Sequence, residues 1–105
     1  MNRHDEAADL NAETLPIRKK VLGTEHPDTL RSMHSLAFEY SKLSRHDEAA
    51  ESFEEIIQIR KRVLGTEHPD TLQSMHSLAF EYSKLNRHDE TADLYAETLQ
   101  IRKGF

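Results

Sequence analysis

The sequence predicts an all-α fold, an α-solenoid of five antiparallel helices, from three observations. The run VLGTEHPDTL at residues 21–30 recurs at 63–72, and SMHSLAFEYSKL at 32–43 recurs at 74–85. RHDE occurs at residues 3–6, 45–48 and 87–90, so every offset is 42 residues. Apolar residues recur at helical steps of three and four, without strand-like alternation. A fixed period of this length is typical of stacked helical units that bury their apolar faces against one another.

The first helix of each period is expected at residues 27–43 and again at 69–85. Pro27 suits the first helical position, where its missing N–H costs nothing, and Asp28 places a negative charge at the positive end of the helix dipole. The apolar stripe that follows has the spacing of one helix face. Its members are Leu30, Met33, Leu36, Ala37, Tyr40 and Leu43.

The second helix of each period is expected at residues 46–63, with copies at 4–21 and 88–104. Basic residues close the helix at Arg60–Arg62, and Gly65 follows as a left-handed stop. Ser44 and Asn86 occupy the tight turn that precedes the helix, since asparagine tolerates a positive φ. The stripe of this helix contains Ala49, Phe53, Ile56, Arg60 and Val63.

The 105 residues are predicted to form one domain of about two and a half repeats of 42 residues. A half repeat spans 1–26, and two further units span 27–68 and 69–105. The first segment departs from the pattern twice. Pro16 replaces the glutamine of Gln58 inside a helix, which predicts a kink or a frayed end, and Asn11 replaces the aromatic residue of Phe53.

Composition excludes several classes of function. The net charge of −5 argues against nucleic-acid binding, and no apolar run is long enough to span a membrane. Without cysteine there is no disulfide framework, thiolate metal site or cysteine nucleophile, and no glycine-rich phosphate loop occurs. We therefore expect a cytoplasmic protein that is not an enzyme, with no catalytic residues, metal or cofactor.

Histidines and basic clusters recur with the period, which favours structural roles over chemistry. His26, His46 and their copies stand at helix starts and are interpreted as turn and capping residues. A metal site between His34 and His76 is the alternative, although a third ligand is not evident. The clusters at 18–20, 60–62 and 102–103 complement the negative ends of helix dipoles, with a basic ladder for acidic partners as the alternative.

The repeat resembles the tetratricopeptide repeat, whose pattern runs W-x2-L-G-x2-Y and then A-x3-F. Methionine replaces the tryptophan, alanine replaces the glycine, and Thr91 departs more mildly. The 42-residue length and the phrase I-R-x-x-x-L-G…H-P-D-T are similar to the kinesin light chain type. The resemblance implies a right-handed superhelix whose first helices line the concave face. It is carried by Met33, Leu36, Ala37, Tyr40, Ala49 and Phe53, and by Met75, Leu78, Ala79, Tyr82, Thr91 and Tyr95.

Phe38 and Phe80 lie off the packing stripe, about 140° from it on a helical wheel at ~100° per residue. Each ring is expected either to contact a bound peptide or to pack on the next repeat. The resemblance places this position in the concave groove, where a carboxylate clamp is not expected because His34, Ser35 and Phe38 replace the basic residues and asparagines of clamp-forming members. The candidate groove contains Arg31, His34, Ser35, Phe38, Lys42, Gln73, His76, Ser77, Phe80 and Lys84.

The function expected from these features is a non-enzymatic scaffold that binds a protein or peptide segment in the groove. A purely structural or self-assembling segment is the first alternative, and the sensor arm of a larger signalling ATPase is the second. Self-association is expected because no polar capping helix closes the array. The apolar residues expected there are Leu94, Tyr95, Leu99, Ile101 and Phe105 at one end, and Leu10, Leu15 or Ile17 at the other. The contact could run head-to-tail, with complementary ends, or close as a two-fold dimer.

Overall fold

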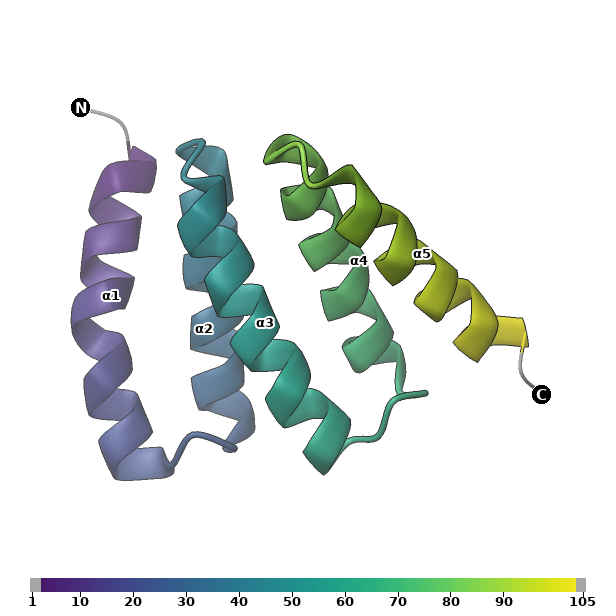
Figure 1. Cartoon of the computed structure of the whole chain (residues 1–105). Coiled ribbons are helices and arrows are strands. Elements are labelled where there is room, and N and C mark those ends of the chain that lie inside the picture. Colours follow the sequence, from purple (N-terminus) through teal and green to yellow (C-terminus); the bar gives the residue numbers. More distant parts are fainter. Residues whose placement is uncertain (1–2, 104–105) are drawn as a thin grey trace.

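In the computed structural model, which describes residues 3–103, five helices follow one another along the chain (Figure 1). They are α1 (Arg3–Leu22), α2 (Pro27–Lys42), α3 (His46–Val63), α4 (Pro69–Lys84) and α5 (His88–Lys103). No strand occurs within residues 3–103. The predicted all-α solenoid is confirmed, and the predicted starts of α2 to α5 coincide with the observed ones.

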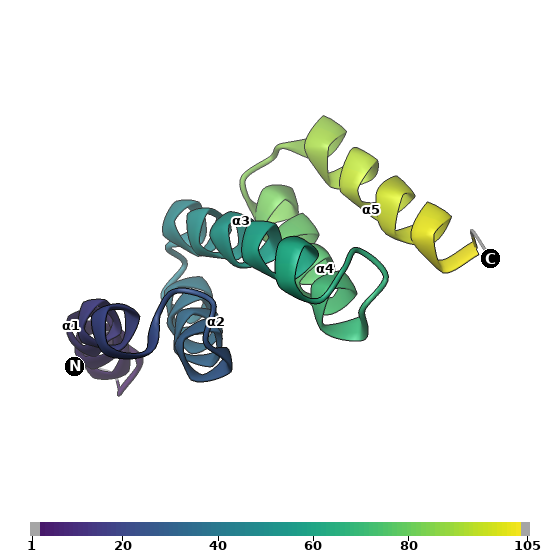
Figure 2. The same ribbon diagram turned by 90° about the horizontal axis from the view of Figure 1, so that it is seen from below.

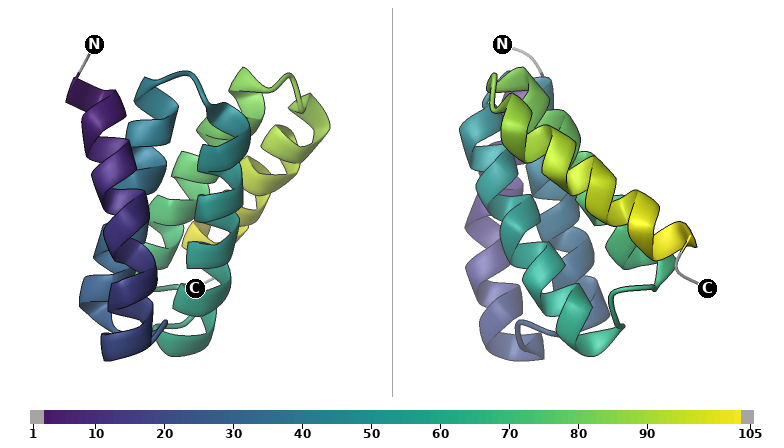
Figure 3. Two further views of the ribbon diagram at one scale, coloured as in Figure 1. Left: turned by 90° about the vertical axis from the view of Figure 1, so that its left-hand side faces the viewer. Right: turned by 45° about the vertical axis from the view of Figure 1, so that its right-hand side comes forward.

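The helices form a zigzag, which is clearest when the molecule is seen from below (Figure 2). Each helix packs on the next one in the chain, from α1 on α2 to α4 on α5. Helices α1 and α5 consequently lie at opposite ends of the molecule (Figure 1). Figure 3 shows the array from the side of α1 and, in its right panel, with α5 turned forward. We call α2 and α4 the first-type helices, and α1, α3 and α5 the second-type helices.

The sequence sets the ends of the first-type helices. At their starts, Nδ1 of His26 and of His68 accepts a hydrogen bond from the backbone N–H two residues later, both at 3.1 Å. The predicted capping role of these two histidines is therefore confirmed. At their ends, Ser44 and Asn86 have φ of 61° and 62°, which allows the Arg45 N–H to reach the Tyr40 carbonyl at 2.8 Å.

The arginine of the RHDE motif stabilises the same turn through its side-chain contacts. Arg45 donates to both carboxylate oxygens of Glu48 at 2.7 Å, and its guanidinium carbon lies 4.6 Å from the Tyr40 ring centroid. This hydrogen-bonded guanidinium lowers the pKa of Glu48. Arg87 repeats the contact with Glu90 and likewise lowers the pKa of that carboxyl group.

The core is centred on α3, the middle helix, which packs between α2 and α4. Phe53 and Ile56 are completely or almost completely buried there, and Met33 and Met75 reach them from the two first-type helices. In α1, by contrast, Ala8 is the one fully buried side chain among those described. In α5, likewise, Thr98 is the one buried side chain among those described. The molecule is therefore packed most strongly in its middle and less strongly at both end helices.

Pro16 does not fray or end α1, so the frayed end, one of the two outcomes expected from sequence, is wrong. The helix continues from Arg3 to Leu22 with the proline inside it. The missing N–H removes one helical hydrogen bond, and α1 packs on α2 in spite of that loss. Gly23, with φ of 97°, ends the helix at the repeat position where Gly65 ends α3.

Candidate functional site

Two phenylalanines on the first-type helices are exposed one period apart. Phe38 is 54% exposed and Phe80 is 47% exposed, whereas the repeated stripe residues Met33, Leu36 and Ala37 are buried. Large aromatic side chains left in water on the same face of two adjacent repeats are typical of an interaction surface rather than of a core.

Two adjoining hollows run along this face, between α2 and α4. One has a volume of about 320 Å³ and the other of about 420 Å³, and both are lined by Phe38, Ser41 and Phe80. We call the combined depression the α2–α4 groove. Its remaining lining residues are Phe53, Gln73, His76, Ser77 and Glu81 in the first hollow, and Lys42, Ser44, His46 and Lys84 in the second.

The ammonium group of a lysine lies over each exposed ring. Lys42 Nζ lies 5.1 Å from the centroid of Phe38, and Lys84 Nζ lies 5.3 Å from that of Phe80. Both distances are within the range of cation–π attraction, which holds the ammonium groups beside the groove. The groove thus combines an apolar surface with positive charge along one side.

A buried carboxylate forms part of the groove floor. Glu81 is 2% exposed, and it accepts hydrogen bonds from Ser41 Oγ at 2.9 Å and lies 2.6 Å from His46 Nδ1. Since His46 makes this contact and no capping bond, the capping role predicted for it is wrong. These three side chains join α2, α3 and α4. Their polar atoms therefore already have hydrogen-bond partners within the fold.

His34 is turned away from the α2–α4 groove, toward α3. Its ring packs edge-on against Phe53, with the centroids 5.2 Å apart, and no partner among the described residues bonds its buried Nε2. Burial lowers the pKa of His34, and the Arg60 guanidinium lowers it further, so the ring is neutral at pH 7. His76 packs similarly on Tyr95 at 5.7 Å. The third ligand that a metal site between the two histidines would need is absent from the described residues.

Arg31 and Ser35 lie apart from the groove, in a hollow of about 340 Å³ between α1 and α2. They line it together with Asn11, Arg18, Asp28 and Ser32. The candidate residues of the sequence analysis therefore fall into two separate hollows, with His34 packed beneath the surface.

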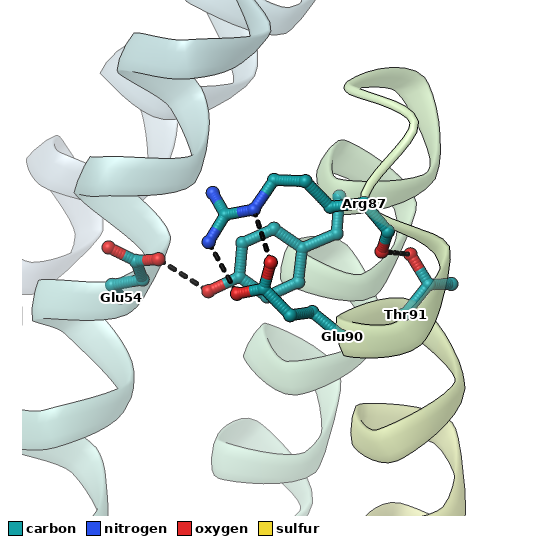
Figure 4. A network of polar contacts seen from close by, with 5 residues as sticks. Glu54, Arg87, Glu90 and Thr91 are labelled. Atoms are coloured by element: carbon teal, nitrogen blue, oxygen red, sulfur yellow. Dashed lines mark hydrogen bonds and ion pairs between the residues drawn. The ribbon is translucent and has the colours of Figure 1, made fainter.

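The α3–α4 joint contains a second polar network, around Tyr82 (Figure 4). Its hydroxyl donates to Glu54 of α3, and the Arg87 guanidinium lies 4.2 Å from its ring centroid. Burial raises the pKa of Tyr82 to about 12, and the Glu54 carboxylate adds to the shift. Ala12 stands at the Glu54 position of α1, so the equivalent Tyr40 has no such acceptor there.

The basic clusters make contacts that the sequence reasoning missed. Lys19 pairs with Glu55 at 3.3 Å and Lys61 with Glu97 at 3.2 Å, so that successive second-type helices are joined by the same ion pair one period apart. Arg62 pairs with Glu25 of the α1–α2 loop at 2.6 Å. These ion pairs could have been predicted from the sequence, because both the lysine and the glutamate recur with a period of 42 residues.

The residues predicted for self-association lie on α5 and α1. Tyr95 is 43% exposed and Leu99 is 52% exposed, whereas Leu94 and Ile101 are partly buried against the core. On α1, Leu10 and Ile17 are exposed and Leu15 is partly buried. Phe105 lies outside the described residues.

The described part of the chain holds no cluster of metal-ligating side chains. No group of three or more histidine, aspartate or glutamate side chains that could hold a metal occurs there. None of the helices within residues 3–103 has the length and hydropathy that crossing a membrane requires.

The fold and its surface define a class, the helical-repeat proteins built from antiparallel helix pairs. A family model described as tetratricopeptide repeat matches residues 1–61 and 40–104. The chain belongs to the tetratricopeptide repeat family. Repeats of this family generally mediate protein–protein interaction and typically serve as non-catalytic modules.

The subtype expected from the sequence is confirmed by two similar crystal structures. Both are of nearly identical TPR-like repeats from a Podosopora anserina protein assigned to the kinesin light chains, one of them a point variant. At 33% identity they superpose with TM-scores of 0.87 and 0.85 over 96% of this chain. The chain spans about half the length of these structures, 48% of each. A comparison with curated proteins gives no significant match.

Proposed function

We propose that this chain binds a segment of a partner protein in the α2–α4 groove, with an apolar side chain seated between Phe38 and Phe80. The observation that carries the proposal is the pair of exposed rings, 54% and 47%, which line two adjoining hollows. Transfer of these rings from water to a protein contact is favourable because about 25 cal/mol is gained per Å² of apolar surface buried.

The charges beside the rings favour acidic residues next to the apolar anchor. Lys42 and Lys84 stand on the same edge of the groove, one period apart. The negative charge of Glu81 lies buried on the groove floor and is bonded to Ser41 and His46. It therefore offsets the positive potential of the two lysines only in part. An extended or helical segment with an apolar residue and flanking Asp or Glu is the ligand that the groove accommodates best.

The test is selection from a phage-displayed peptide library on the 105-residue chain, followed by affinity measurement. Selected peptides should share an apolar residue beside acidic ones. Phe38→Ala with Phe80→Ala should weaken their binding at least tenfold while circular dichroism shows unchanged helicity. Leu99→Ala, which removes a comparably exposed apolar side chain on α5, is the matched control. Equal loss in the control, or loss of helicity in the double variant, would contradict the proposal.

Self-association is a second candidate, supported by the surface of α5. Tyr95 and Leu99 are 43% and 52% exposed, whereas Phe53 and Ile57 at the same repeat positions are 2% and 7% exposed beneath α4. A surface of this kind can contact its own copy across a two-fold axis, so we favour a two-fold dimer through α5 over the head-to-tail contact expected from sequence.

Light scattering across a concentration series tests this second candidate. The mass should rise toward that of a dimer at micromolar concentration, and Leu99→Glu should return it to a monomer. Ile101 is less suitable for substitution because it packs against the core. A monomeric mass at every concentration, with full helicity, would rule the candidate out.

A further inference from the structure

The hollow between α1 and α2 differs from the α2–α4 groove in chemistry. Its volume is about 340 Å³, and every residue that lines it is polar. Two arginines face it from different helices, Arg18 from α1 and Arg31 from α2. The remaining lining residues are Asn11, Asp28, Ser32 and Ser35. We call this depression the α1–α2 hollow.

The spacing along the two helices explains why these side chains meet. Asn11 and Arg18 are seven residues apart, which is two turns of α1 and therefore one face. Asp28, Ser32 and Ser35 are separated by four and three residues, and this places them on one face of α2, with Arg31 beside them. The contact between α1 and α2 brings the two faces together.

The repeat supplies an internal reference, because the same positions occur between α3 and α4. There the aromatic ring of Phe53 stands in place of Asn11, and Gln73 in place of Arg31. Arg60, at the Arg18 position, donates to Ser74 Oγ at 2.6 Å and to the Asp70 carbonyl at 3.0 Å. That guanidinium is therefore already satisfied by the fold, and Ser74 is buried beneath it.

In the α1–α2 hollow the corresponding donors are still available. Arg18 makes no hydrogen bond or ion pair with the described residues, and Ser32 and Ser35 are not bonded within that part of the chain either. Arg31 is 76% exposed at its side chain and has only a long ion pair, 3.7 Å to Asp28. Two substitutions relative to the second joint have thus removed a ring and added a cation.

We propose that the α1–α2 hollow binds a phosphate monoester, carried by a phosphorylated serine or threonine of a partner protein. Two guanidinium groups can each present a fork of N–H donors to phosphate oxygens, with the two hydroxyl groups and the Asn11 amide as further donors. A phosphate has three terminal oxygens and a charge of about −1.5 to −2 near pH 7, which matches this excess of donors better than a carboxylate does. Asp28 is the one carboxylate in the lining, and the phosphate replaces it as the partner of Arg31.

The proposal is independent of the peptide groove, since inorganic phosphate alone is a sufficient probe. In ¹H–¹⁵N NMR titrations at constant ionic strength, sodium phosphate should shift the signals of Asn11, Ser32 and Ser35 with saturation in the millimolar range, and sodium chloride should not. Arg18→Gln should weaken this binding at least tenfold. Arg102→Gln removes the same charge at the same repeat position of α5, and it should leave phosphate binding unchanged.

A second variant keeps the test decisive if Arg18 also matters for stability. Asn11→Phe combined with Arg31→Gln gives this joint the residues of the α3–α4 joint, and it should abolish phosphate binding with helicity retained. A peptide with phosphoserine should then bind the original chain more tightly than both its unphosphorylated form and free phosphate. Shifts that are equal for chloride, or that persist unchanged in Arg18→Gln and in the double variant, would overturn the proposal. Binding of unphosphorylated library peptides, lost in the Phe38 and Phe80 variant, reports on the groove separately.

Discussion

The α1–α2 and α3–α4 joints are built on one repeat plan but differ in how they are filled. In the α3–α4 joint, Phe53 is buried, Glu54 accepts from Tyr82 and Arg60 is bonded to α4. In the α1–α2 joint these positions hold Asn11, Ala12 and an Arg18 that has no bond to the described residues. In both joints the second-type helix nevertheless packs on the first-type helix that follows it, so a joint forms with or without the aromatic ring. The second-type helix decides whether the joint becomes core or an accessible surface.

The largest effect is expected when the core side chain of the second joint is exchanged for that of the first. Phe53→Asn should destabilise the chain by about 3–5 kcal/mol, because it leaves a cavity and a buried amide. The reverse change, Asn11→Phe, should be neutral or stabilising. Thermal unfolding followed by circular dichroism measures both, and similar losses for the two variants would mean that the joints are equally packed.

Pro16 offers a way to strengthen the weaker joint. Since α1 is helical on both sides of the proline, Pro16→Gln should restore one helical hydrogen bond and raise stability by up to about 3 kcal/mol. The glutamine is the residue found at the equivalent Gln58 and Gln100. The melting temperature should rise accordingly, with Gln58→Ala as a control of little effect. An unchanged melting temperature would contradict the expected gain.

A smaller loss of stability is expected when the buried carboxylate of Glu81 is replaced. Glu81→Gln keeps the shape of the side chain but weakens its bonds to Ser41 and His46, and a loss of about 1.5–3 kcal/mol is expected for bonds to a charged group. Glu39, the equivalent residue of α2, is less buried, so Glu39→Gln should cost less. Urea denaturation of the two variants checks the order, and a larger loss for Glu39→Gln would refute it.

The smallest effect concerns the pH dependence contributed by Tyr82. Its pKa is raised to about 12 in the folded chain, above the value of about 10 in an unfolded chain. The proton is thus held more tightly by the folded state, so the contribution is complete below pH 10 and is lost as the pH rises through 12. Relative to Tyr82→Phe, the unmodified chain should lose about 1–2 kcal/mol between pH 10 and 12. Urea denaturation of the two chains across this pH range measures the difference, and an equal pH dependence of both would contradict it.

The sequence predicted the fold well because the period, the helix stripes and the end signals are all local. Pro27, Gly65 and Asn86 each act on the backbone beside them, and these helix ends are found where they were expected. The frayed end expected at Pro16 was wrong because the packing of α1 on α2, which is not local in sequence, maintains the helix on both sides of the proline. The His46–Glu81 contact was missed since it lies across 35 residues, and only the packing of three helices brings it about.

The candidate groove was predicted only in part, since Ser41, His46 and Glu81 line it without having been expected there. Phe38, Phe80 and the two lysines beside them were identified from their position off the packing stripe, and they do share the α2–α4 groove. Helical spacing alone did not separate Arg31 and Ser35 from that set, because the separation comes from what Asn11 and Arg18 contribute on the facing helix. A side chain can be placed on its own helix from sequence, whereas its neighbours depend on the angle between helices.

The trio of Ser41, His46 and Glu81 has a consequence for how such a gene can change in length. Ser83 and His88, one period later, are both exposed and repeat the two partners of the buried carboxylate. A duplication of any 42 consecutive codons would bring a further Glu81 equivalent to them, so every new buried carboxylate would find its hydroxyl and its imidazole. An insertion inside α4 that rotates Glu81 away from Ser41 and His46 would leave the buried charge unpaired, at a cost of several kcal/mol. Growth by whole repeats of 42 residues keeps the three side chains together and is therefore the change in length that this trio favours.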